Sequence, residues 1–321
     1  MSRTAPILLS FYALSNGKSM MAIGQLTYSS LRDFSFKNYG RRKTFRSILA
    51  LYRTRFFDHE AIELVFDKGT YKTITDEAGS FFLEVNDASN IHELKSIRLI
   101  NGQSVEVVEG LYTPAVHTVQ SAEIIVSDID DTLLHSHISN KLLKFRTLLF
   151  TSVEKRKAVK EMMKVIHDFA DTGIEPFYLS NSEQNLYPLI YRFLRNNNFP
   201  RGPLFLKQMR HLRDVFRRKD ILKRDIHKLT TLEKLLRFFP DKKFILIGDN
   251  TQNDLKIYLS TAQKFPESVR AVIIRKVISQ PLDKILFNEA ADKFKTLGIS
   301  FFYDKSFPHG FELRSVVQSQ L

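Results

Sequence analysis

The stretch "EIIVSDIDDT", residues 123–132, places three aspartates directly behind a short apolar run. Runs of this length and composition are typical of buried strands in parallel sheets. Ligands of such sheets bind beyond the carboxyl ends of the strands. Carboxylates this close together destabilise each other unless a positive charge lies between them. The stretch therefore predicts a buried strand whose carboxyl end holds a cation.

From about residue 121 onward, apolar strand candidates alternate with helical patterns, which predicts an α/β domain with a parallel sheet over residues 121–321. The predicted strands are Glu123–Ser127, Glu175–Leu179, Leu204–Leu206, Lys243–Ile247 and Val269–Ile274. The predicted helices are Val153–Asp171, Asn185–Asn197 and Leu229–Phe239. The domain boundary is expected between Thr118 and Ala122.

Residues 1–120 are rich in short strand patterns and turns, which predicts a smaller β-sandwich-like domain. Its first apolar segment, Pro6–Leu14, runs into a turn-forming stretch at 15–18 and has no small-residue cleavage site, so we interpret it as half of a hairpin and not as a signal peptide. One helix is expected here, with an apolar stripe at Phe45, Ile48, Leu49, Tyr52 and Phe56 and basic residues around it. Such a helix either lies on an anionic membrane or packs on its own domain, and the second is the commoner case.

The amino-acid composition excludes several kinds of functional site. The chain has 321 residues, 43% of them hydrophobic and 26% charged, and it contains no cysteine. Thiolate nucleophiles, thiolate metal sites and disulfides are therefore excluded. No apolar run approaches the length of a membrane span. These features fit a cytoplasmic protein.

The net charge of +13 is unevenly distributed, with +2 in residues 1–120 and +11 in residues 121–321. Residues 201–228 alone contribute +7. A local excess of this kind favours an anionic partner, although a solvated helix face is the simpler explanation. We hypothesise that the basic residues of 207–228 draw in an anionic surface.

Polar residues close three of the predicted strands and should meet at one edge of the sheet. They are Asp128, Asp130, Asp131 and Thr132 after the first strand, Ser180, Asn181 and Ser182 after the second, and Gly248, Asp249 and Asp254 after the fourth. His227 and Lys228 precede the predicted helix that leads into the fourth strand. A set of carboxylates, a hydroxyl and an ammonium group is suited to phosphoryl transfer. Carboxylate oxygens are ligands that Mg²⁺ prefers. One carboxylate can attack phosphorus, and a second can act as general acid and base.

The first motif, Ile124–Thr132, resembles the hhhhDxDx(T/V) motif of the haloacid dehalogenase superfamily. The resemblance implies that Asp128 is the nucleophile, that Asp130 is the general acid and base, and that Thr132 supports the turn. It also implies that Ser180, Asn181 and Lys228 bind phosphate. Mg²⁺ would be held by Asp128, Asp130, Asp249 and Asp254.

Four blocks across residues 120–280 narrow the resemblance to the actin-patch phosphatidate phosphatase family. They are "VSDIDDT", "YLSNS", "HKLTTLEKLLRFFPDKKFILIGDNTQND" and "FPESVRAVIIRKV". Two segments differ from the family's usual pattern: Ser182–Tyr187, which reads SEQNLY, and Gly248–Leu255. The resemblance implies a Mg²⁺-dependent phosphomonoester hydrolase that forms an aspartyl phosphate. Its substrate would be a phosphatidate-type lipid, met at an anionic membrane surface, and no nucleic-acid partner is expected.

Other interpretations remain open. A phosphatase acting on phosphoprotein, nucleic-acid ends or sugar phosphates is the main alternative, and a non-catalytic lipid- or protein-binding module is the second. The gaps at Leu133–Gly173 and Glu183–His227 are too short for a full cap domain, which favours a bulky substrate. A calcium loop would need glycine where Leu133 stands. His135 and His137 are expected to be flap or surface residues, Asp131 to be support, and Arg275 has no assigned role.

Overall fold

The computed structural model describes residues 6–29, 34, 40–134, 158–207, 221–251, 253–278 and 282–307. His135, His137 and most of the basic stretch 207–228 lie outside these residues, apart from Lys207 and the residues from 221 onward. Within the described part, no helix is both long enough and apolar enough to cross a membrane.

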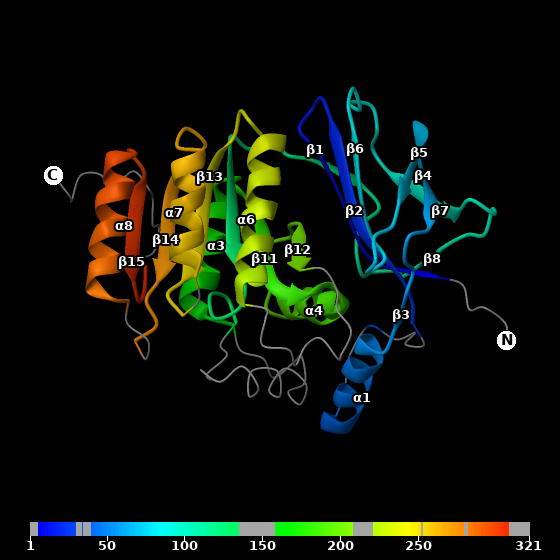
Figure 1. Ribbon diagram of the computed structural model, residues 1–321, viewed down its shortest axis with the longest axis horizontal. Helices are drawn as coiled ribbons and strands as arrows, with labels where there is room; N and C mark the ends of the chain where they lie inside the picture. The colour runs from blue at the N-terminus through cyan, green and yellow to red at the C-terminus, as the bar shows by residue number, and fades with distance from the viewer. Residues whose placement is uncertain are drawn as a thin grey trace.

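The second half of the chain forms a parallel six-stranded sheet in the order β12-β11-β10-β13-β14-β15 (Figure 1). Its strands are β10 (Glu123–Asp128), β11 (Glu175–Glu183), β12 (Leu204–Lys207), β13 (Lys243–Asp249), β14 (Val269–Arg275) and β15 (Ser300–Asp304). Its helices are α3 (Lys160–Asp171), α4 (Tyr187–Asn196) behind the short 3-10 helix η2 (Gln184–Leu186), α6 (Ile221–Phe238), α7 (Asp254–Lys264) and α8 (Lys284–Thr296). The α/β class and the parallel sheet are confirmed.

Successive residues of β10 point to opposite faces of the sheet, and both faces are covered. Ile125 packs with α3 and α4 residues such as Val165 and Phe193. Ile124 packs with residues of α6, α7 and α8, among them Leu232 and Phe294. A strand buried on both faces must be apolar throughout, and this explains why the run before Asp128 has no alternating pattern.

The first part of the chain forms two further sheets. One contains β1 (Ile7–Ser15), β2 (Met20–Tyr28), β3 (Arg55–Phe56), β6 (Ser80–Val85), β8 (Glu106–Val107) and β9 (Val116–Thr118). The other has the order β5-β4-β7, from β4 (Ala61–Phe66), β5 (Gly69–Ile74) and β7 (Leu94–Leu99). The hairpin predicted at the start of the chain is present, because β1 and β2 pair antiparallel around the 15–18 turn.

The predicted basic helix is α1 (Arg41–Tyr52), one turn shorter than its apolar stripe. The Thr54 hydroxyl donates a hydrogen bond to the Leu51 carbonyl at 2.8 Å, and Phe56 belongs to β3, so its inclusion in the stripe was wrong. Ile48 and Leu51 are fully buried in a core that also contains residues of α3 and α4. The apolar face of α1 therefore packs on the protein itself, but against the α/β half as well, and not only on its own domain as predicted.

Candidate functional site

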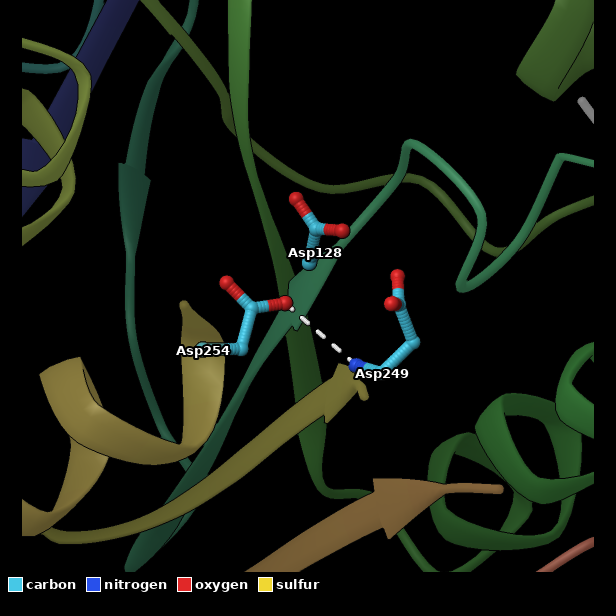
Figure 2. Close-up of side chains that lie close together, drawn as sticks. All are labelled: Asp128, Asp249 and Asp254. Atoms are coloured by element: carbon cyan, nitrogen blue, oxygen red, sulfur yellow. Dashed lines mark hydrogen bonds between the residues drawn. The ribbon is translucent and has the colours of Figure 1, made fainter. Parts of the chain in front are cut away.

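Asp128 ends β10 at the centre of the parallel sheet, with β11 on one side and β13 on the other. Its side chain is fully buried. Asp249 ends the neighbouring strand β13, and Asp254 begins helix α7 five residues later. The three carboxylates offer oxygen atoms that all lie within 4.8 Å of one another (Figure 2).

Gly248 gives Asp254 the room to join this group. A Cβ atom added at Gly248 would lie 2.6 Å from Asp254 Oδ2 and 2.8 Å from its Cβ. From this position, Asp254 Oδ2 accepts a hydrogen bond from the Asp249 backbone N–H at 3.3 Å, the bond drawn in Figure 2. The small Gly248 and the hydrogen bond between Asp249 and Asp254 therefore together fix the position of the Asp254 carboxylate.

Lys228 places an ammonium group among the carboxylates. Its Nζ lies 2.7 Å from Asp128 Oδ1 and 2.5 Å from Asp254 Oδ1, and the side chain is fully buried. The prediction that Lys228 precedes its helix was wrong, because α6 begins at Ile221 and carries Lys228 in its first half. The regular backbone there fixes the direction in which the ammonium points.

Burial and the repulsion between the carboxylates raise the pKa values of Asp128 and Asp249. Burial raises the pKa of Asp128 well above its usual value, Lys228 opposes the shift, and Asp254 and Asp249 add to it. The pKa of Asp249 is raised for the same two reasons, burial first and Asp254 second. Burial alone would lower the pKa of Lys228, but Asp128 and Asp254 raise it.

Three clustered carboxylates face one lysine among the described residues, so the group carries surplus negative charge when ionised. Charges of one sign are not buried without compensation. Hard oxygen donors of this kind fit Mg²⁺ or a similar divalent cation.

Thr132 connects the ends of β10 and β13. Its Oγ1 lies 3.1 Å from Asp128 Oδ2 and 3.1 Å from Asp249 Oδ2, so its single proton can serve either carboxylate. Asp131, between the two motif positions, has a positive φ of 65°. Its backbone carbonyl accepts a hydrogen bond from Arg275 at 2.8 Å, and its Oδ2 lies 3.3 Å from the Thr251 hydroxyl. These contacts agree with supporting roles for Thr132 and Asp131.

Asp130 lies apart from the group of three and is half-buried. Its Oδ2 accepts hydrogen bonds from Ser180 at 2.7 Å and from Ser182 at 3.1 Å. Both serines extend β11 beyond its predicted end. Asn181, between them, has a buried Oδ1 without a hydrogen-bond partner among the described residues. Two hydroxyls thus orient the second carboxylate of the DxD motif.

Sequence reasoning missed two contributors, Ser182 as a partner of Asp130 and Arg275 as an anchor for the turn. Arg275 ends β14 in register with Asp249 on β13. Its place at a strand end was the signal that could have identified it, since the same rule selected the aspartates. The ion pair between Lys228 and Asp254 had no such signal.

Comparison with known proteins identifies relatives of this site. Residues 124–276 match the family model for the catalytic domain of phosphatidate phosphatase APP1. The chain is 34% identical over 154 residues to phosphatidate phosphatase APP1 of Saccharomyces cerevisiae, covering 47% of this chain and 25% of the relative. It is 28% identical over 211 residues to the uncharacterized protein C29B5.04c of Schizosaccharomyces pombe, covering 64% of this chain and 33% of the relative.

The chain therefore spans only a quarter to a third of the length of these two curated relatives. Among solved structures, a carbohydrate acetylesterase from Xanthomonas citri aligns with 92% of this chain and 75% of its own, at 11% identity and a TM-score of 0.25, which is too weak to support a conclusion. The sequence matches carry more weight because residues 124–276 include every site residue described above. The family resemblance predicted from the sequence is confirmed by these matches: residues 124–276 are similar to the catalytic domain of phosphatidate phosphatase APP1.

Proposed function

We propose that this chain is a phosphomonoester hydrolase of the phosphatidate phosphatase type. Its parallel sheet would be a haloacid-dehalogenase-like arrangement, and the N-terminal sheets would be a sandwich-like accessory domain. The observation that carries the proposal is the buried group of Asp128, Asp249 and Asp254 with Lys228, inside a region that matches the APP1 catalytic domain.

Mg²⁺ would be held by the carboxylates of Asp128, Asp249 and Asp254, together with the backbone carbonyl of Asp130. The donor set fits, because these are hard oxygens with more negative charge than Lys228 balances. The ion would supply charge neutralisation that lets an anionic carboxylate approach an anionic phosphate.

Asp128 is the proposed nucleophile. One of its carboxylate oxygens forms a bond to phosphorus while the bond from phosphorus to the substrate's alcohol oxygen breaks, giving an aspartyl phosphate. Lys228 and Thr132 hold this carboxylate in place through their contacts to Oδ1 and Oδ2. Because Lys228 is fully buried and contacts two carboxylates, its position is fixed before substrate arrives.

Asp130 is the proposed general acid and base. It gives a proton to the departing alcohol oxygen and later takes one from the water that attacks the aspartyl phosphate. That second attack releases inorganic phosphate and restores Asp128. The hydroxyls of Ser180 and Ser182 keep the Asp130 carboxyl turned toward the end of β11, where we also place phosphate contacts from Ser180 and Asn181.

The substrate proposal rests on the relatives and on charge. The yeast relative is named for phosphatidate, a lipid phosphate. On this chain, α1 exposes Arg42, Lys43 and Arg46, and residues 121–321 carry +11. Positive surface of this kind favours an anionic membrane over a neutral solute. Activity at the cytoplasmic surface of a membrane is therefore part of the proposal.

The test is a substrate panel with and without Mg²⁺: phosphatidate in mixed micelles, lysophosphatidate, phosphopeptides, sugar phosphates and p-nitrophenyl phosphate. We expect Mg²⁺-dependent phosphate release, fastest from phosphatidate. Asp128→Asn should lower kcat at least about a thousandfold. The matched control is Asp241→Asn, at an exposed aspartate, which should leave kcat unchanged. If Asp128→Asn kept wild-type kcat, the proposed mechanism would be wrong. If phosphopeptides or sugar phosphates were the better substrates, the lipid assignment would be wrong.

A further inference from the structure

A cavity of about 450 Å³ lies between the first sheet of the chain and the α/β half. Strands β1, β2 and β6 form one wall, and α6, β12 and η2 form the other. Its volume falls in the range of about 300–1,000 Å³ that is typical of small-molecule sites. None of the residues predicted to act in catalysis or to bind phosphate or metal lines this cavity.

Two contacts join the opposite walls and hold the cavity open between them. The Ser80 hydroxyl on β6 donates a 2.5 Å hydrogen bond to Gln184 Oε1 on η2. The ammonium of Lys234 on α6 lies 4.9 Å from the centre of the Phe82 ring on β6. Because both contacts link elements of the two halves, the cavity belongs to the assembled chain.

The lining is mixed: apolar side chains include Phe11, Met21 and Phe81 on one wall and Phe205 and Leu235 on the other, and polar side chains such as Asp76 and Thr231 also line it. Two large apolar side chains of the lining are exposed to solvent, Ile74 at 65% and Phe82 at 39%. Accessible apolar side chains beside a partly apolar cavity are typical of a binding surface. The lining therefore suits an amphipathic molecule, with an apolar portion and a polar group.

One polar group in the lining lacks a partner. The Nε2 atom of His227 is buried and has no hydrogen-bond partner among the described residues. Because Nε2 has no partner, we assign Nδ1 as the atom that interacts with the backbone carbonyl of Ser180. Burial first, and then the nearby charges of Lys207 and Lys228, lower the pKa of His227 to about 4, so the ring is neutral at pH 7.

A neutral imidazole that donates from Nδ1 presents a lone pair at Nε2. Nε2 can therefore accept a hydrogen bond but cannot donate one. A ligand that satisfies it must bring an O–H or N–H group. A buried acceptor without a partner is uncommon and needs an explanation of this kind.

We propose that the cavity binds a single-chain lipid alcohol, whose apolar chain lies against Phe81 and Phe205 and whose hydroxyl donates to His227 Nε2. The hydroxyl accounts for the unpartnered acceptor, and the chain accounts for the apolar part of the lining and for the accessible Ile74 and Phe82. The inference goes beyond the proposed phosphatase activity, because the ligand carries no phosphate. Since His227 bonds to Ser180 and precedes Lys228, the occupied cavity lies one residue away from the carboxylate group.

The test is calorimetric titration of the full chain with 1-oleoylglycerol, below its aggregation concentration. Methyl oleate, which has the same chain but no hydroxyl, is the comparison ligand. We expect saturable one-site binding of 1-oleoylglycerol, and binding of methyl oleate at least about tenfold weaker. His227→Phe should weaken 1-oleoylglycerol by about the same factor and leave methyl oleate unaffected.

Two variants fill the cavity from opposite walls, Ile23→Trp on β2 and Thr231→Phe on α6, and each should abolish binding. The matched control is Ile100→Trp, at a residue that is 55% exposed and outside the lining, and it should bind normally. Absence of saturable binding to the wild-type chain would overturn the proposal. Normal binding of 1-oleoylglycerol to Ile23→Trp or Thr231→Phe would also overturn the proposal. Equal affinity for 1-oleoylglycerol and methyl oleate would show that His227 does not bind the hydroxyl. Each result can be read without any phosphate being hydrolysed.

Discussion

The two halves of the molecule bury polar groups in opposite ways. In the N-terminal sheets the buried polar side chains are neutral, and two of them bond to the backbone: the Thr75 hydroxyl donates to the Phe57 carbonyl at 2.7 Å, and Gln25 Nε2 donates to the Ala78 carbonyl at 3.0 Å. At the carboxyl end of the parallel sheet, Asp128, Asp249 and Asp254 are buried with Lys228.

Neutral groups that satisfy backbone atoms stabilise a fold at little electrostatic cost. A buried cluster with surplus charge does not, because burial penalises each ionised carboxylate. The contrast indicates that the first set holds the N-terminal sheets together, whereas the second is retained for what it binds.

The largest expected effect comes from Lys228→Met. The variant leaves the buried carboxylates without their cation, and it should lower the free energy of unfolding by about 3–5 kcal/mol in metal-free buffer. Thr75→Val removes two neutral hydrogen bonds, one to the Phe57 carbonyl and one from the Glu60 N–H, and should cost only about 1–2 kcal/mol. Urea unfolding at pH 7 measures both. If the two variants lost the same free energy of unfolding, the inferred difference between the charged and the neutral buried groups would be wrong.

An intermediate effect is expected from Gly248→Ala. The new methyl group meets the Asp254 carboxylate, so the carboxylate must move, at a cost of about 1–3 kcal/mol and with reduced phosphatase activity. Gly40→Ala, where nothing lies within 4 Å of an added Cβ, is the control and should change stability by less. Thermal unfolding and phosphate release are the measurements. If Gly248→Ala retained full activity, the position of Asp254 would not matter for catalysis.

The smallest expected effect concerns a charge pair that joins the two halves, His117 on β9 with Glu175 on β11. The hydrogen bond that the His117 ring donates to the Glu175 carboxylate raises the pKa of His117 above 6.5. Burial opposes the shift of Glu175, but His117 and the backbone of Gln120 lower the pKa of Glu175 below 4.5. Because the His117 side chain is 45% exposed, the pair should contribute less than about 1 kcal/mol.

The sign of the pH dependence follows from these directions. The contribution of His117 is fully present below pH 6.5 and is lost as the pH rises through its raised folded-state pKa. Glu175→Gln should therefore reduce stability more at pH 6 than at pH 9. Glu84→Gln, at an exposed glutamate of β6, serves as the control in urea unfolding at both pH values. A loss that is the same at pH 6 and pH 9 would contradict the pairing.

The sequence predicted the central strands well because each must be apolar over its buried length. β10 and β13 start at the predicted residues, Glu123 and Lys243, and extend one or two residues further. The aspartates at their ends were found by the same rule. Their roles as nucleophile, proton carrier and metal ligands stay predictions.

Helix boundaries were predicted less well, for local reasons. The apolar stripe of α1 continues to Phe56, but the Thr54 hydroxyl caps the Leu51 carbonyl and ends the helix first. The charged residues before Lys228 hid the start of α6 at Ile221. The contact of Lys228 with Asp254 depends on how α6 and α7 pack, and no residue pattern encodes that distance.

The pairing of β1 bears on the order in which this chain folds during synthesis. β1 meets β2 at once through a tight turn, but its parallel partners β8 and β9 begin only at Glu106 and Val116. The face of β1 that carries Ile7 and Leu9 is buried in a core shared with Phe193 of α4, which emerges later still. β1 is thus synthesised well before several of the elements that cover it, and it stays open to wrong pairing until they emerge.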